Sequence, residues 1–208
     1  MSALAEALAP LYRAYLRRLD EMAARIGDDA ALREPLLRDD AQHPLRNESG
    51  FATRFDVADA RSGETFEVHG AHPDEPAARE VAVGRLAFRL QPGNWEELTV
   101  RCVFAEPPAA EAAAALAELV HAWAVLAAHA GFAGGSAPST ASTGASRWSG
   151  RLHSVTVRPQ SVEIIASLDL GTCPPVALDA LADALVAFDG EVAPLARVVV
   201  GGTSSEDS

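Results

Sequence analysis

Apolar residues recur every three or four positions along the first part of the chain. The stripe consists of Leu4, Leu8, Leu11, Tyr15, Leu19, Met22 and Ile26. This spacing predicts an amphipathic helix over residues 3–27, with Gly27 as its end. Residues 29–38 are predicted to add a short helix, and residues 39–50 a loop.

The hydrophobic period then changes to two. Alternating apolar and polar residues predict strands near 51–57, 66–68, 81–90 and 98–104. The apolar positions change parity at Gly84, which predicts a β-bulge there. Taken in sequence order, these strands predict an antiparallel meander over residues 51–105.

The second half of the chain predicts an alanine-rich helix over 108–130, a flexible loop over 132–149 and a strand, strand, helix, strand unit over 150–200. Residues 201–208 are expected to be a disordered tail. This order predicts a single α+β domain over residues 1–200, with a mostly antiparallel sheet and helices packed on one face. A unit of strand, Pro-Pro, helix and glycine occurs at 97–131 and again at 162–190. Pseudo-symmetric halves and coincidence both stay open as explanations.

The segment GFAGGSAPSTASTGASRWSG, residues 131–150, is the most unusual stretch of the chain. A phosphate-binding loop follows a strand and opens a helix, whereas this segment follows a predicted helix and leads into a strand. It also contains no lysine. The composition therefore predicts a connector between two folded parts.

Charge and composition exclude several chemistries. The chain has no lysine, which excludes Schiff-base catalysis, a P-loop and the protein-kinase mechanism. Its 208 residues carry a formal net charge of −12, so we expect no binding to nucleic acid or to anionic membranes. An acidic surface favours a basic protein partner, although solubility alone also explains it.

The chain begins without the pattern of a signal peptide, and glutamates and histidines interrupt its most apolar window, 109–130. We therefore expect a soluble, cytoplasmic protein. Cys102 and Cys173 form no zinc or redox motif. Whether the two cysteines pair stays open.

The best candidates for a metal site are His69, His72 and Asp74, which lie close together in a predicted surface turn. Nitrogen and oxygen ligands of this kind suit first-row metals. Histidines and aspartates are also ordinary in such turns, so we expect no metal and no cofactor. His153 is a further candidate base, but the sequence supplies neither a nucleophile nor an orienting acid for it.

The residues expected to contact a partner are Arg147, Trp148 and Trp95. Trp148, near the end of the glycine-rich segment, is expected either to pack on the sheet or to form an exposed anchor, and packing is favoured because large aromatic residues are mostly buried. The element order and the acidic charge are similar to those of small acidic secretion chaperones and of some toxin-immunity proteins. This similarity implies a role in protein binding.

Three functions remain open. The favoured one is a non-catalytic acidic protein that binds a protein partner through its sheet or helix face, as an immunity protein, chaperone or adaptor does. The second is an enzyme or a small-ligand or metal-binding protein with a site near the turn of His69 and His72. The third is a structural subunit of a larger assembly.

Overall fold

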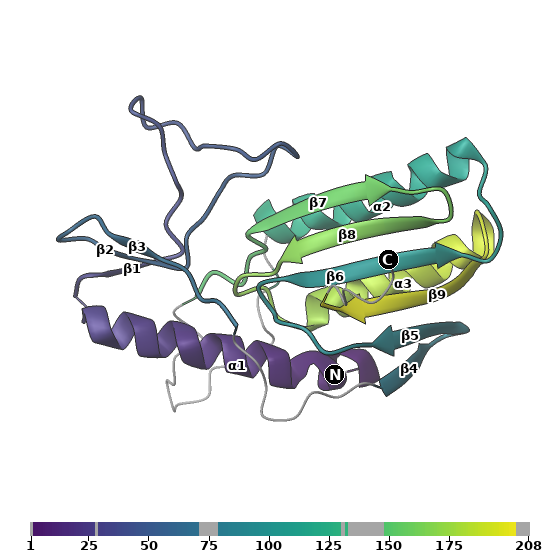
Figure 1. Cartoon of the computed structure of the whole chain (residues 1–208), viewed down its shortest axis with the longest axis horizontal. Helices are drawn as coiled ribbons and strands as arrows, with labels where there is room; N and C mark the ends of the chain where they lie inside the picture. Colours follow the sequence, from purple (N-terminus) through teal and green to yellow (C-terminus); the bar gives the residue numbers. More distant parts are fainter. Residues whose placement is uncertain (1, 28, 71–78, 130–131, 133–147, 203–208) are drawn as a thin grey trace.

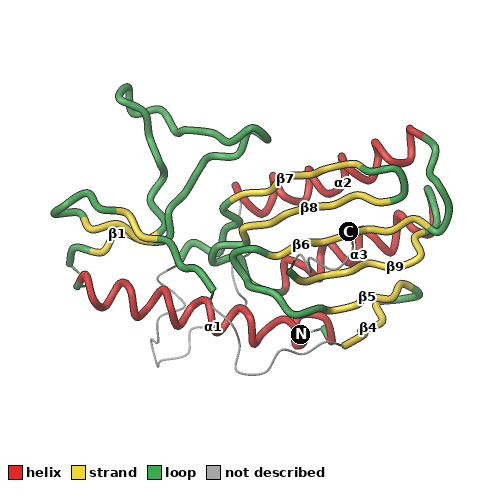
Figure 2. The backbone as a smooth tube through the Cα atoms, viewed as in Figure 1, coloured by secondary structure: helices red, strands yellow, loops and turns green. Residues whose placement is uncertain are grey.

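The computed structural model describes residues 2–27, 29–70, 79–129, 132 and 148–202. These residues form three helices and two mostly antiparallel sheets, which confirms the predicted α+β class (Figures 1 and 2). The prediction of a disordered tail falls mainly on residues outside this set, as does that of a flexible loop over 132–149.

The first helix, α1 (Ala3–Ile26), confirms the predicted amphipathic helix. Ser2 caps it, because its hydroxyl accepts a hydrogen bond from the Ala5 N–H at 3.1 Å. At the other end the Gly27 N–H donates to the Ala23 carbonyl, and Gly27 has a φ of 94°, which favours glycine. The apolar stripe is buried against α3, β1, β2 and β4.

A small sheet follows α1, made of β1 (Ala31–Arg33), β2 (Val57–Asp59) and β3 (Thr65–Phe66) in the order β1-β2-β3. The predicted short helix over 29–38 is therefore wrong. Pro35 disfavours a helical conformation at Glu34, and β1 instead pairs with β2. The predicted strand at 51–57 is largely replaced by isolated bridges at Ala52 and Arg54.

The large sheet contains β4 (Arg79–Val83), β5 (Leu86–Leu90), β6 (Leu98–Phe104), β7 (Ser154–Pro159), β8 (Glu163–Asp169) and β9 (Leu195–Gly201). Its order is β4-β5-β9-β6-β8-β7. The predicted meander over 51–105 is wrong, because the last strand, β9, lies between β5 and β6 and runs parallel to β5. The predicted bulge at Gly84 is also wrong. Gly84 lies in the turn of the β4–β5 hairpin, and this turn causes the change of parity.

The segment from β6 to β9 has the order of a split βαβ, or ferredoxin-like, unit. It runs β6, α2 (Ala110–His129), β7, β8, α3 (Val176–Glu191), β9, and its four strands lie in the order β9-β6-β8-β7. The two strands of the sequence echo, β6 and β8, are therefore neighbours in one sheet. That the two halves are pseudo-symmetric stays a prediction.

Helices α2 and α3 cover one face of the large sheet, as predicted, and the other face is covered by no described helix (Figure 1). Most apolar residues of the strands point toward α2 and α3 and form the core, whereas the uncovered face carries mainly polar residues together with Ile165 and Val199. By length and composition α2 is apolar enough to cross a membrane, with a mean hydropathy of 1.4. In this structure it packs against β7, β8 and α3.

Candidate functional site

A buried histidine, His153, lies at the centre of a cluster of carboxylates. It directly precedes β7, and its side chain is 2% exposed. Its Nε2 lies 3.1 Å from Glu34 Oε1, and its Nδ1 lies 3.5 Å from Asp56 Oδ1 and 3.7 Å from Asp169 Oδ2. We call these four residues the His153 cluster. Glu34 follows β1, Asp56 precedes β2, His153 precedes β7 and Asp169 ends β8, so the cluster joins the two sheets.

Glu34 is held in the cluster by its backbone and by its neighbours. Its φ of 50° is uncommon for a residue other than glycine, and it turns the side chain inward after β1. One carboxylate oxygen accepts a hydrogen bond from the Thr172 hydroxyl at 2.6 Å, and the other accepts one from the Ser149 N–H at 2.6 Å. The Arg54 guanidinium donates to the Glu34 carbonyl at 3.0 Å.

Asp56 is also held from two sides. Its Oδ1 accepts a hydrogen bond from the Tyr15 hydroxyl of α1, and its Oδ2 accepts one from the Val68 N–H at 2.6 Å. Asp169, at the end of β8, accepts a hydrogen bond from the Gly171 N–H at 3.0 Å. The cluster therefore contacts α1 as well as both sheets.

The environment makes His153 a cation at neutral pH. Burial alone would lower its pKa, but the charge of Asp169 and the interactions with Glu34 and Asp56 outweigh burial and raise the pKa to about 10. Burial likewise acts to raise the pKa of Glu34, but hydrogen bonds from His153, Thr172 and Ser149 and the charge of His153 lower it to about 2. For Asp56 burial dominates, and its pKa is raised.

This arrangement does not resemble a nucleophilic triad. A general base needs an unprotonated ring nitrogen near the operating pH, whereas His153 holds its proton to about pH 10. The nearby hydroxyl, that of Thr172, donates to Glu34 and not to the imidazole. The geometry instead suits a buried ion pair that fastens the small sheet to the large one.

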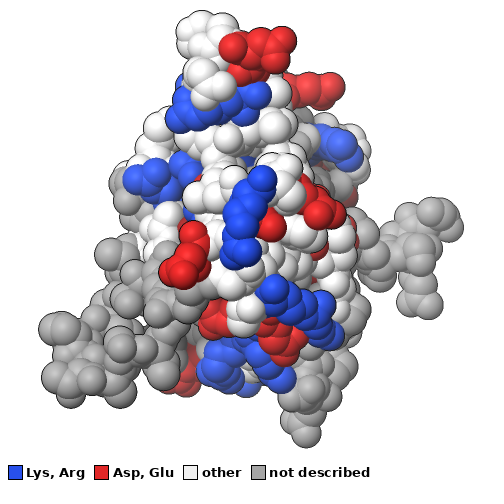
Figure 3. Space-filling view, turned by 90° about the vertical axis from the view of Figure 1, so that its left-hand side faces the viewer, with Lys and Arg blue, Asp and Glu red and all other residues white. Residues whose placement is uncertain are grey.

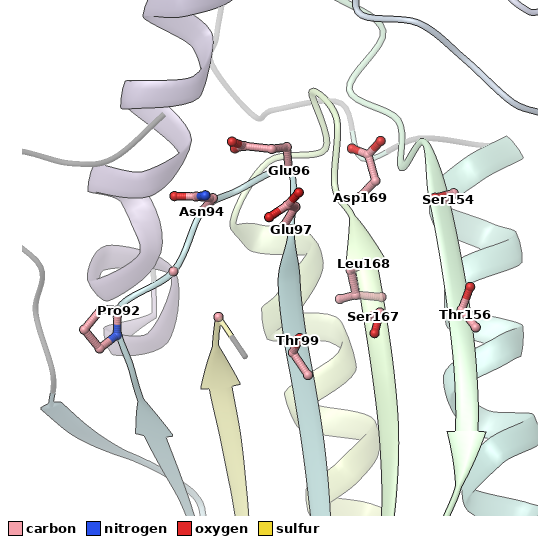
Figure 4. Close-up of a pocket in the computed structure, with 12 residues that line it drawn as sticks. Pro92, Asn94, Glu96, Glu97, Thr99, Ser154, Thr156, Ser167, Leu168 and Asp169 are labelled. Atoms are coloured by element: carbon pink, nitrogen blue, oxygen red, sulfur yellow. The ribbon is translucent and has the colours of Figure 1, made fainter. Parts of the chain in front are cut away.

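Next to the cluster, a groove of about 580 Å³ runs over the uncovered face of the large sheet (Figure 4). Glu96, Glu97 and Asp169 line the end of the groove where β6 begins and β8 ends, but Glu96 is buried and its carboxylate points away from the other two. Beyond them lies a row of hydroxyls from three adjacent strands. The register pairs Thr99 with Ser167 and Ser167 with Thr156.

A recess of about 160 Å³ leads from the groove toward the cluster. Glu96, Glu97 and Asp169 line both the groove and the recess, and His153 lies at the wall of the recess. His69, one of the residues suggested as a metal ligand, lines the same recess. Its side chain is exposed, and its Nε2 lies 3.7 Å from a Glu67 carboxylate oxygen.

Elsewhere the charges are mixed. Figure 3 looks onto the end of the molecule that carries the small sheet, where arginines and carboxylates alternate over the surface. This end is therefore not a uniform acidic patch. The grouping of carboxylates at the groove is a local feature and does not simply follow from the net charge.

The structure places two of the suggested partner contacts in the interior. Trp95 is fully buried and donates from its Nε1 to the Gly171 carbonyl at 3.1 Å. Trp148 is 9% exposed, donates to Asp20 and lies under the Arg33 guanidinium, so it packs inward, as the favoured alternative predicted. Both indoles thus present little or no surface to a partner.

The remaining suggested site residues, Arg147, His72 and Asp74, lie outside the described residues. Among the residues that the structure describes, no group of three or more histidines, cysteines or carboxylates is arranged to hold a metal ion. Cys102 and Cys173 are both buried and unpaired.

Sequence reasoning identified His153 but missed its partners Glu34, Asp56 and Asp169. The proline after Glu34 gave no signal, because a residue before proline favours extended backbone, whereas Glu34 has a φ of 50°. The pairing of Glu34 with His153 spans 119 residues, and nothing in the local pattern indicates it.

Comparison with known proteins finds no match: neither a family model, nor a curated protein, nor a solved structure is similar to this chain. The groove and the His153 cluster are therefore the features of the molecule that indicate a function.

Proposed function

We propose that this protein is a non-catalytic binding protein that recognises a basic segment of another protein on the uncovered face of its large sheet. The observation that carries the proposal is the groove, which combines a suitable volume with the exposed Glu97 and the partly exposed Asp169 at one end. Lysine and arginine side chains pair favourably with such a carboxylate group. The net charge of −12 would add long-range attraction for a basic partner.

The lining of the groove also suits a protein segment better than an apolar ligand. Of its twelve lining residues, four carry hydroxyls and three carry carboxylates, and none is aromatic. Small-molecule sites are usually lined by apolar and aromatic side chains instead. Hydroxyls both donate and accept, so they can pair with the polar groups of an extended backbone. Such binding is the activity of immunity proteins, chaperones and adaptors alike.

A charge reversal in the groove tests the proposal. The Glu97→Arg variant replaces an exposed carboxylate at the groove, and the matched control Glu118→Arg makes the same change on the exposed side of α2. The probe is a fluorescent octa-arginine peptide, followed by anisotropy at low and at moderate salt. We expect the wild type and Glu118→Arg to bind it and Glu97→Arg to bind roughly tenfold more weakly, a loss of about 1.4 kcal/mol.

Equal losses in the two variants would show that only the net charge matters and would refute the groove as the site. Absence of binding at low salt would refute the proposal as a whole. A pull-down from the cell's own extract then identifies the natural partner, with the wild type and Glu97→Arg as paired baits. A partner of this site is retained by the first bait only.

A second candidate, a protein that binds a small organic cation, is supported by the recess beside His153. Five carboxylate residues line the recess, and the positive charges of Arg54 and His153 and the exposed His69 line it as well, so carboxylates predominate. Calorimetry with free arginine and with spermidine distinguishes this candidate from the first. A stoichiometric heat with either compound would favour it, whereas binding of the peptide alone would favour the protein partner.

A further inference from the structure

The uncovered face of the large sheet carries its charges in a definite order along the strands. On β7 the side chains of Ser154, Thr156 and Arg158 share this face, because residues two apart in a strand point to the same side. The intervening Val155 is buried on the helical side. The order along β7 is therefore hydroxyl, hydroxyl, guanidinium.

The register extends this order to the neighbouring strands. Asp169 lies opposite Ser154, and Ser167 lies opposite Thr156. On β6, Glu97 precedes the strand, and Thr99 and Arg101 follow on the same face. Three rows thus cross the sheet: a carboxylate row, a hydroxyl row and an arginine row.

The carboxylate row and the arginine row are four residues apart along each strand, or about 13 Å. Within the arginine row, Ile165 pairs with both Arg101 and Arg158. Arg101 is held by Glu163, with its Nε 3.1 Å from Oε2. Arg158 is exposed at the sheet edge. The face therefore offers negative charge at one end and an exposed guanidinium at the other.

In the aligned mode of packing on a sheet face, an extended chain lies within about 30° of the strands beneath it. Its own side chains alternate, so residues i, i+2 and i+4 face the sheet and span about 13 Å. This span equals the separation of the carboxylate and arginine rows.

We infer that the groove takes an extended partner segment whose sheet-facing side chains are basic at i, small and polar at i+2 and acidic at i+4. This inference rests on the proposed function and specifies the partner. The basic side chain pairs with Glu97 and Asp169, and the acidic one with Arg158. The small residue between them allows the backbone to approach the partly exposed hydroxyls of Ser167 and Thr156.

Three fluorescent peptides in one extended nine-residue background test the inference. The first carries Arg, Ser and Glu at positions 3, 5 and 7. The second carries Arg, Glu and Ser at the same three positions, which halves the separation of the two charges. The third carries Arg, Ser and Arg at these positions. We expect the wild type to bind the first at least about threefold more tightly than either of the others, as one lost exposed ion pair implies.

The Arg158→Glu variant should reverse the preference and bind the third peptide more tightly than the first. Its matched control is Arg17→Glu on the exposed side of α1, which should leave the preference unchanged. Equal affinity of the wild type for the first and third peptides, with binding still sensitive to Glu97→Arg, would overturn the charge order and leave the basic-segment proposal standing. Failure of all three peptides to bind in a Glu97-dependent manner would overturn both. Tighter, Arg158-dependent binding of a single-stranded oligouridylate would also overturn the inference, because the arginine row would then serve a polyanion.

Discussion

Raising the pH should weaken the fold by removing the proton from His153. The pKa of this imidazole rises from 6.5 to about 10 on folding, because the cluster carboxylates outweigh the opposing effect of burial. The protonated form is therefore favoured in the folded state. The resulting stabilisation is complete below pH 6.5 and is lost as the pH rises from 6.5 through about 10.

The magnitude follows from the shift. About 3.5 pKa units correspond to about 5 kcal/mol, which is similar to the ~3–5 kcal/mol cost of leaving a buried charge unpaired. Linkage applied to these two pKa values predicts that the contribution of His153 to the free energy of unfolding falls by about 3 kcal/mol between about pH 6 and pH 9. The shift at Glu34 describes the same ion pair and is not added to this figure.

Urea unfolding followed by tryptophan fluorescence measures this change, with the ionic strength held constant. His153→Gln should remove most of the pH dependence and lower the stability at about pH 6 by several kcal/mol. His121→Gln, at an exposed position on α2, is the matched control and should keep the wild-type slope. Glu34→Gln and the double variant complete a cycle in which the expected coupling between Glu34 and His153 is about 3 kcal/mol.

A flat profile between about pH 6 and pH 9 in the wild type would refute the charged state assigned to His153. The same conclusion would follow if His153→Gln retained the full wild-type slope, because the slope would then belong to other groups. Coupling near zero in the cycle would refute the ion pair itself.

Three further predictions concern the surroundings of the cluster and the core. Gly171→Ala should destabilise the fold by about 3 kcal/mol or more, because the new Cβ would lie 2.3 Å from the His153 imidazole and the φ of Gly171 is 51°. The control Gly63→Ala, with open space around it, should lose only about 1 kcal/mol, and paired thermal melts distinguish the two variants. Trp95→Phe should cost about 1–3 kcal/mol in chemical unfolding because it leaves a buried carbonyl without its indole donor, and a loss near zero would contradict that role. Cys102 and Cys173 are buried, and their pKa values are raised to about 12, so both should resist a thiol reagent in the native state and react in urea. Rapid labelling of the native protein would contradict this prediction and show that the interior opens.

Several elements were accessible from sequence because their cause is local. The helix at Ala3–Ile26 follows from a stripe with a period of three to four residues, and its end follows from Gly27. The strands after the glycine-rich segment follow from strict alternation. Alternation does not indicate which strands pair with each other, because every strand that buries one face shows the same pattern.

The wrong meander and the wrong bulge have one common origin, the pairing of strands, whereas the wrong helix over 29–38 overlooked the local effect of Pro35. The meander was expected because neighbours in sequence usually pair, but β9 offers parallel pairing to β5 and antiparallel pairing to β6, and it separates them. The change of parity at Gly84 has two local explanations, a bulge and a hairpin turn. Only the pairing of Val83 with Leu86 distinguishes them.

The sequence alone determined the class of the fold, the positions of most helices and strands, and the chemistries excluded by the absence of lysine, because each of these depends on composition or on neighbouring residues. The tertiary structure decided the order of the strands, which residues surround His153 and which carboxylates line the groove. Glu34, Asp56 and Asp169 are far apart along the chain, and they meet only because the small sheet folds against the ends of β7 and β8. Contacts of that kind depend on the path of the whole backbone, which no local pattern encodes.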